Sequence, residues 1–363
     1  MSTNESSPRK FLIGSRPIGF YEDVYFIADI AANHDGDLNR AKDLIYAAAE
    51  AGADAAKFQH FQAETIVSQT GFDLLGSETI SHQSSWKKSV TEVYREASVK
   101  LEWSQALKET CQEAGIDFFT TPYSLELADA MDRFVPAYKI GSGDITWIQL
   151  IEHIASKGKP YILATGASTL DDVVRAVEAG WNINKELCLM QCNTNYTGDI
   201  ENLKYINLNV LKTYKEMFPG VLLGLSDHTP GHATVLGAVA LGARMIEKHF
   251  TDDTTREGPD HKFSMDPLSW SDMVMRTREL EAALGGGVKR VEANEEATSV
   301  VQRRSIRARR DILSGETLEI SDFDYLRPCP KDGLSPFEIS KVIGKRMSRN
   351  ISNGEHLTWQ HLE

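Results

Sequence analysis

The chain has 363 residues, of which 41% are hydrophobic and 25% charged, a composition typical of a globular protein with room for one barrel-sized and one small domain. Its formal net charge of −13 argues against a general nucleic-acid binder, which needs clustered lysine and arginine. No apolar run approaches the ~20 residues of a membrane span, and the N-terminus MSTNESSPRK lacks the apolar stretch of a signal peptide. Four cysteines without C-x-x-C spacing are typical of reduced thiols. We therefore expect a cytoplasmic protein with neither nucleic-acid nor membrane partners.

Apolar, strand-like runs alternate with helical patterns along most of the chain. The runs occupy residues 24–30, 53–59, 116–121, 136–140, 160–165, 187–193, 221–226 and 244–250. Several of the helical segments between them end at glycine, the expected C-terminal stop. Eight strands alternating with eight helices over ~250 residues predict an α/β fold of the (β/α)₈ TIM-barrel type. A doubly wound sheet is the alternative.

One connection of this predicted barrel is unusually long. Residues 61–100 are largely polar and contain no strand-like run. Loops of this length are generally functional or mobile, and this one follows the carboxyl end of the second predicted strand. A decorative insertion is the other interpretation.

A separate module is expected after the barrel. Three glycines open a charged linker, 285–298, which separates a barrel domain at 1–284 from a tail at 299–363. The segments RRDILSGETL (309–318) and RNISNGEHL (349–357) share the pattern Arg-x-Ile-x-x-Gly-Glu-x-Leu. Each predicts a short strand entering a glycine turn, and hence a small β-rich domain with an internal repeat. The tail holds 11 Lys and Arg against 9 Asp and Glu, a net charge of +2, whereas the residues before it carry −15.

Two histidines end neighbouring predicted strands, His228 in LSDHT and His249 in EKHFTD. The carboxyl ends of barrel strands form the active face, so we expect the two imidazoles to lie close together there. Such a pair suits a divalent transition metal with open positions for water and substrate. Acid–base and purely structural roles are the alternatives. Four nearby carboxylates could support the histidines: Asp227, Glu247, Asp252 and Asp260.

Two lysines, Lys57 and Lys139, end the second and fourth predicted strands. A buried lysine needs a partner, so two at one barrel mouth indicate a bound anion. Hydroxyls are expected at the same level, from Thr121, Ser142, Thr165 and Ser226. The set is more typical of a phosphate or carboxylate site than of a Schiff base, which requires one desolvated lysine. Lysines that extend to solvent are the alternative.

Several motifs taken together resemble the sialic acid synthase family. They are FIADIAANHDGDLNRAKDLI, AAKFQHF, TTPYS, AYKIGSGD, ILATGAST, LGLSDHT, EKHFTD, GPDHKFSM and the tail SIRARRDILSGETL, in matching order over about residues 20–360. The resemblance implies a TIM barrel joined to a C-terminal antifreeze-like (SAF) domain. It implies condensation of phosphoenolpyruvate with an N-acetylated amino sugar, and a divalent metal: Mn²⁺ in the first place, with Mg²⁺ or Co²⁺ as alternatives. It also implies a domain-swapped homodimer in which each tail caps the partner's site.

Motif by motif, the resemblance also implies site residues. His228 and His249 would bind the metal, and Asp29, Lys57 and Lys139 would be catalytic. The phosphoenolpyruvate and sugar positions would be Gln59, Thr121, Ser142, Thr165, Asn193, Thr194, Tyr196, Ser226, Asp260 and, from the tail, Arg327.

This chain departs from the family pattern in three places. Asp29 replaces the usual glutamate and shortens that carboxylate's reach by one methylene. Ala164 removes one possible hydroxyl. The run Cys192-Asn193-Thr194-Asn195-Tyr196 differs in order from the family's, which leaves open whether Asn193, Thr194 or Asn195 meets phosphate. The altered acceptor region suggests a sugar other than plain N-acetylmannosamine.

Overall fold

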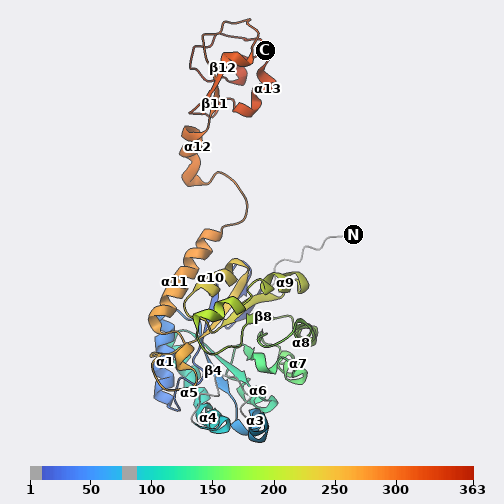
Figure 1. Cartoon of the computed structure of the whole chain (residues 1–363), viewed down its shortest axis with the longest axis vertical. Helices are drawn as coiled ribbons and strands as arrows, with labels where there is room; N and C mark the ends of the chain where they lie inside the picture. The colour runs from blue at the N-terminus through green and yellow to red at the C-terminus, as the bar shows by residue number, and fades with distance from the viewer. Residues whose placement is uncertain (1–9, 76–87) are drawn as a thin grey trace. The chain divides into compact units, whose positions relative to one another are not determined.

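The chain forms two compact units, Met1–Gly285 and Gly286–Glu363. Their structure is known from a computed structural model that describes residues 10–75 and 88–363 (Figure 1). None of the described helices is both long and apolar enough to cross a membrane.

The larger unit contains a closed barrel of eight parallel strands, in which β10 pairs with both β9 and β3. The strands are β3 (Tyr25–Asp29), β4 (Ala55–His60), β5 (Asp117–Pro122), β6 (Tyr138–Ile140), β7 (Tyr161–Ala164), β8 (Leu187–Cys192), β9 (Leu222–Asp227) and β10 (Ala243–His249). Each predicted run overlaps one of these strands. The TIM-barrel prediction is confirmed, and closure excludes the doubly wound sheet, which has two free edges.

Helices surround the barrel and connect its strands (Figure 1). They are α1 (Leu38–Glu50), α5 (Ser104–Ala114), α6 (Leu125–Met131), α7 (Ile148–Ser156), α8 (Leu170–Ile183), α9 (Val210–Met217), α10 (Ala233–Ala240) and α11 (Pro267–Leu284). Local sequence sets several of their ends. The Thr169 and Asp172 side chains form a capping box that starts α8. Gly115 ends α5 in the left-handed region at φ +76°, which glycine adopts without strain.

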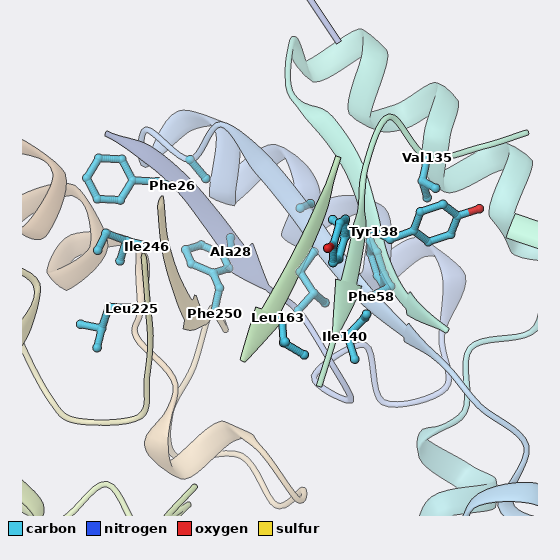
Figure 2. Close-up of a cluster of buried hydrophobic side chains, with 14 of the residues drawn as sticks. Phe26, Ala28, Phe58, Val135, Tyr138, Ile140, Leu163, Leu225, Ile246 and Phe250 are labelled. Atoms are coloured by element: carbon cyan, nitrogen blue, oxygen red, sulfur yellow. The ribbon is translucent and has the colours of Figure 1, made fainter. Parts of the chain in front are cut away.

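The barrel wall separates two apolar clusters because successive side chains of a strand point to opposite faces. Strand residues such as Phe26, Phe58 and Ile246 belong to the larger cluster, which also includes residues of the surrounding helices (Figure 2). Their neighbours Tyr25 and Met245 belong to a smaller cluster inside the barrel. This alternation decides which polar residue at a strand end faces the barrel interior and which faces the helices.

A hairpin of β1 (Lys10–Ile13) and β2 (Arg16–Gly19), which the sequence analysis did not predict, packs against the inner cluster through Phe11, Ile13 and Ile18. Arg16 forms an ion pair with Asp54, which directly precedes β4. The hairpin thus covers the amino ends of the strands, opposite the end where the predicted site residues lie.

The described part of the long connection at 61–100, between β4 and β5, contains helices rather than strands. These are α2 (Ala63–Ile66), α3 (Gln69–Leu75) and α4 (Val90–Ala97), the last started by a capping box between Ser89 and Glu92. The described part of 61–100 therefore agrees with the prediction that no strand forms there. Residues 76–87 of this stretch lie outside the described residues.

The smaller unit has its own core, built around Ile306, Phe323 and Met347. Its elements are α12 (Glu296–Gln302), β11 (Ser305–Ala308), β12 (Phe323–Leu326) and α13 (Ile339–Val342), with β11 and β12 antiparallel. The two repeated segments pair with each other through an antiparallel bridge between Ile312 and Ile351. Each segment makes isolated bridges instead of the short strand that its sequence predicts.

Candidate active site

A cavity of about 320 Å³ lies at the carboxyl end of the barrel strands. Eleven of the predicted site residues line it: Asp29, Lys57, Gln59, Thr121, Lys139, Ser142, Thr194, Tyr196, Ser226, His228 and His249. Asp260 lines a smaller cavity of about 180 Å³, which shares Gln59, Tyr196 and His249 with the first. Residues far apart in the sequence thus meet at one barrel mouth.

Two lysines and two carboxylates form a buried group in the centre of the larger cavity. Lys57 Nζ lies 2.6 Å from Asp29 Oδ2 and 3.9 Å from Glu247 Oε1, and Lys139 Nζ lies 3.2 Å from the same Glu247 oxygen. The formal charges of these four groups cancel. Glu247 Oε2 is buried and has no hydrogen-bond partner. A multiply charged anion bound here would therefore need a further cation.

Both members of the Lys57–Asp29 pair are held in their charged forms. Burial lowers the pKa of Lys57, but the carboxylates of Asp29 and Glu247 outweigh it, and the pKa is raised overall. Burial raises the pKa of Asp29, but Lys57 and His249 together lower it by more than burial raises it, so the net shift is downward. Asp29 also accepts hydrogen bonds from Gln59 Nε2 at 3.1 Å and from the backbone N–H of Ala31 at 3.1 Å. Its orientation is therefore fixed by several donors.

The two histidines lie side by side above this group, with ring centroids 5.4 Å apart. Nδ1 of His228 donates to the Asn193 carbonyl at 3.1 Å, so Nε2 is the acceptor nitrogen when the ring is neutral. Burial lowers the pKa of His228, but Cys192 and Asp227 outweigh burial and the pKa is raised overall. Nδ1 of His249 is buried without a hydrogen-bond partner, 4.0 Å from Asp260 Oδ2. Burial lowers the pKa of His249 to about 3, so this imidazole is neutral. Neutral imidazoles with a free nitrogen are suitable metal ligands.

A metal would nevertheless not be held by protein side chains alone. Within residues 10–75 and 88–363, no cluster of three or more His, Cys, Asp or Glu side chains has the geometry of a metal site. The pair of histidines fits an ion that takes its remaining ligands from water or substrate, as catalytic ions commonly do.

Three predicted site residues lie away from the cavity lining. The Thr165 hydroxyl donates to the Met190 carbonyl at 3.0 Å, because Thr165 follows the inward-facing Ala164 and so faces the helices. The Asn193 side chain donates to the Tyr205 carbonyl at 3.4 Å, so only its backbone reaches the site, through His228. Arg327 is exposed in the smaller unit.

The four carboxylates expected near the histidines lie in different places, and only one of them is beside a histidine. Asp260 alone approaches His249 from the loop after β10. Glu247 pairs with the lysines instead, and Asp252 pairs with Arg40. Asp227 faces away from the cavity and accepts hydrogen bonds from Lys248 and Thr234. Alternation along β9 and β10 accounts for this division, because Ser226 and Glu247 face inward.

The cavity is also lined by residues that were not predicted as site residues, and two of these are titratable groups with shifted pKa values, Cys192 and Asp144. Burial raises the pKa of Cys192, but His228, Ser142 and Lys139 together outweigh burial, and the pKa is lowered overall. Burial raises the pKa of Asp144 to about 6, and its Oδ2 has no hydrogen-bond partner. Asp144 ends the Gly-Ser-Gly-Asp segment after β6, and Cys192 has the inward parity of β8, so both signals were present in the sequence.

A closed parallel barrel with buried lysines and histidines around a cavity at the carboxyl ends of its strands is typical of an enzyme. The chain belongs to the NeuB family, which it matches over residues 44–289, and it matches the SAF domain over residues 303–363. It is 36% identical to the N,N'-diacetyllegionaminic acid synthase of Legionella pneumophila, over 96% of this chain and 98% of that protein. It is 31% identical to the N-acetylneuraminate-9-phosphate synthase of Mus musculus, over 97% and 96% of the two chains.

A solved structure supports the same assignment. The N-acetylneuraminic acid (sialic acid) synthetase of Leptospira borgpetersenii, in complex with citrate, is similar with a TM-score of 0.70 at 30% sequence identity. The similarity covers 80% of this chain and 95% of that one. The resemblance inferred from the sequence is confirmed, and the protein is an enzyme of the acid-synthase class.

Proposed function

We propose that this enzyme condenses phosphoenolpyruvate with the open-chain form of an N-acetylated amino sugar. The acceptor would be N-acetylmannosamine or a 6-deoxy diacetamido analogue. C3 of phosphoenolpyruvate would form a bond to the aldehyde carbon, and water would add at C2. Breaking the bond between C2 and the phosphate oxygen would release inorganic phosphate and leave a nine-carbon 2-keto-3-deoxy acid.

The lysine–carboxylate group supports binding of phosphoenolpyruvate. Lys57 and Lys139 would donate charged hydrogen bonds to its carboxylate and phosphate. The hydroxyls of Thr121, Ser142 and Ser226 line the same cavity and would complete the contacts. Thr165, Asn193 and Thr194 remain part of the proposal, although among these only the Thr194 side chain lines the cavity. Asp29, held ionised by Lys57, would accept a proton as water adds at C2.

The acceptor would lie above this anion, between the histidines and the smaller cavity. Gln59, Tyr196 and Asp260 would contact the sugar there. His228 and His249 would hold a divalent ion, Mn²⁺ in the first place and Mg²⁺ or Co²⁺ as alternatives. Such an ion, when bound, polarises the aldehyde oxygen as a Lewis acid. It would also supply positive charge, which the two lysines cannot provide because the carboxylates of Asp29 and Glu247 balance them.

The observation that carries the proposal is a pair of buried ion pairs, Lys57–Asp29 and Lys139–Glu247, in the same cavity as His228 and His249. The chain that holds them belongs to the NeuB family. The test is phosphate release from phosphoenolpyruvate with candidate sugars and Mn²⁺. Release that depends on both an N-acetylated sugar and the metal is the expected result. Release only with a pentose acceptor would indicate a 3-deoxy-octulosonate-type synthase, and sugar binding without release would indicate a non-catalytic protein.

We also propose a domain-swapped homodimer in which Arg327 of one subunit completes the partner's site. Arg327 is exposed on a unit with its own core, consistent with a role outside that unit. An Arg327→Ala subunit mixed with a His249→Ala subunit should regain activity, because one site in each mixed dimer combines an intact barrel with an intact tail. A mixture as inactive as its parents would contradict the swap.

The cytoplasm is the proposed compartment. Four cysteines are free, Cys111, Cys188, Cys192 and Cys329, which is typical of proteins kept under reducing conditions. Retention of activity in millimolar thiol and loss on thiol oxidation would support this assignment.

A further inference from the structure

The smaller cavity continues the active site away from the lysines. It shares six lining residues with the larger cavity, Gln59, Ile66, Tyr94, Tyr123, Tyr196 and His249. An acceptor held by its aldehyde near His249 can therefore extend its far end into this space of about 180 Å³. The smaller cavity is the place where acceptors of different length and substituents would be distinguished.

One wall of this cavity is largely apolar. We call it the apolar wall and define it as Phe61, Ile66, Val93, Tyr94 and Ala97. These residues come from the end of β4 and from α2 and α4 of the long connection. The Phe61 ring lies 5.3 Å from the Tyr94 ring and 5.7 Å from the Tyr123 ring, centroid to centroid, so the aromatic groups support one another.

No cation lines this cavity among the described residues. Its one carboxylate is that of Asp260, and no lysine or arginine is present in the lining. Arg95, the arginine within α4, pairs with Glu64 at 2.6 Å with both side chains exposed. A phosphate group in the cavity would thus lose its hydration, meet Asp260 and gain no opposite charge from the described lining residues.

We propose that the apolar wall selects acceptors that end in a methyl group, so that the substrate class is the 6-deoxy N-acylated amino hexoses. The inference rests on the proposed function and narrows it. A methyl group buries apolar surface against Val93 and Ala97, whereas a hydroxymethyl group loses hydrogen bonds to water and a phosphate ester loses more. Two substrates that differ by one small group in an apolar pocket typically differ by about 10-fold to 200-fold in kcat/KM.

The test uses three N-acetylated amino hexoses that differ only at C6, which carries methyl, hydroxymethyl or phosphate. With full-length protein, phosphoenolpyruvate and Mn²⁺, we expect kcat/KM to be at least about 10-fold higher for the methyl sugar than for the hydroxymethyl sugar. The phosphorylated sugar should give no turnover above background. Equal values for methyl and hydroxymethyl, or preference for phosphate, would overturn the inference.

Two variants locate the effect in the wall. Val93→Thr keeps the shape but adds a hydroxyl, and should bring the methyl-to-hydroxymethyl ratio close to one. Ala97→Lys should permit measurable turnover of the phosphorylated sugar. Arg95→Gln, on the same helix but outside the cavity, is the matched control and should keep the wild-type ratio. If Val93→Thr lowers kcat/KM for every sugar equally, the wall has only a structural role.

The outcomes separate this inference from the proposed function. Phosphate release with several sugars but without the methyl preference contradicts the inference alone. Absence of phosphate release with every N-acetylated sugar, from protein that binds phosphoenolpyruvate and is folded by circular dichroism, contradicts both.

Discussion

Two buried ion pairs of the same chemical type lie on opposite faces of the barrel wall. Lys57 and Asp29 face the interior, with side chains 2% and 2% exposed, and Lys248 and Asp227 face the helices, with side chains 1% and 0% exposed. Burial and charge are thus the same in both. The difference lies in their surroundings: Asp227 is saturated by Lys248, Thr229 and Thr234.

The inner pair instead belongs to an incomplete network. Glu247 Oε2 and His249 Nδ1 have no hydrogen-bond partner, and the group lines a cavity. Buried polar atoms without partners are unfavourable in a purely structural network. Unsatisfied atoms beside a cavity therefore identify the binding face better than buried charge does. The following substitutions test this distinction.

Loss of a histidine on the inner face should have the largest effect. We expect His249→Ala, and likewise His228→Ala, to abolish the phosphate release that Mn²⁺ restores to chelator-treated enzyme, because one imidazole is a poor anchor for an ion. For His249→Ala the free energy of unfolding should fall less than for Asp227→Ala, because Nδ1 has no hydrogen-bond partner to lose, although the Phe263 ring contact and the 3.5 Å approach of Nε2 to Asp29 disappear. Phosphate assays and urea unfolding measure the two effects. Full activity in excess chelator would exclude the metal.

Loss of a carboxylate on the outer face should affect folding instead. Asp227→Ala leaves Lys248 buried and unpaired, which lowers the free energy of unfolding by about 3–5 kcal/mol. Urea unfolding measures it. The double variant Asp227→Ala/Lys248→Met should recover most of the loss, because the uncompensated charge is gone. A loss no larger than that of an exposed pair such as Lys88–Glu96 would show that Asp227 is not needed for the fold.

Loss of a lysine on the inner face should weaken phosphoenolpyruvate binding. Lys139→Met removes a charged hydrogen bond worth about 1.5–3 kcal/mol, so the KM should rise roughly 10-fold to 150-fold. Glu247 keeps Lys57 at 3.9 Å and the Ser226 hydroxyl at 3.2 Å, so the stability loss should be smaller than for Asp227→Ala. Steady-state kinetics at saturating sugar measures the change. An unaltered KM would place the anion elsewhere.

Two threonines give the smallest and most local comparison. Thr165→Val should leave the KM for phosphoenolpyruvate unchanged, since its hydroxyl faces away from the cavity. Thr121→Val, with a hydroxyl that lies 3.4 Å from Lys57 Nζ and lines the cavity, should raise it. A KM raised by Thr165→Val alone would mean that substrate binding reorganises the end of β7.

Much of this arrangement can be predicted from strand parity. Lys57 lies two residues after the inward Ala55, and Lys139 two after the inward Ala137, so strand parity places both side chains inside the barrel. The same rule, applied to Thr165 beside Ala164, would have placed that hydroxyl outside. The β1–β2 hairpin was not predicted because its four-residue strands carry too short a pattern to distinguish from a loop.

The sequence by itself determined the barrel, its strand positions and the family. Apolar runs, helical periodicity and glycine stops are each properties of a single segment, so the amino-acid sequence of that segment is enough to predict the element. The motifs around Lys57, Lys139, His228 and His249 likewise depend only on neighbouring residues.

Only the tertiary structure decided which of these residues meet. That Glu247 pairs with both lysines, that His249 Nδ1 has no partner, and that α4 supplies an apolar wall all depend on register between strands and on packing of a long connection. Barrel closure sets that register by satisfying the hydrogen bonds of eight strands at once. No single segment of the sequence contains this information, because the constraint is shared by the whole barrel.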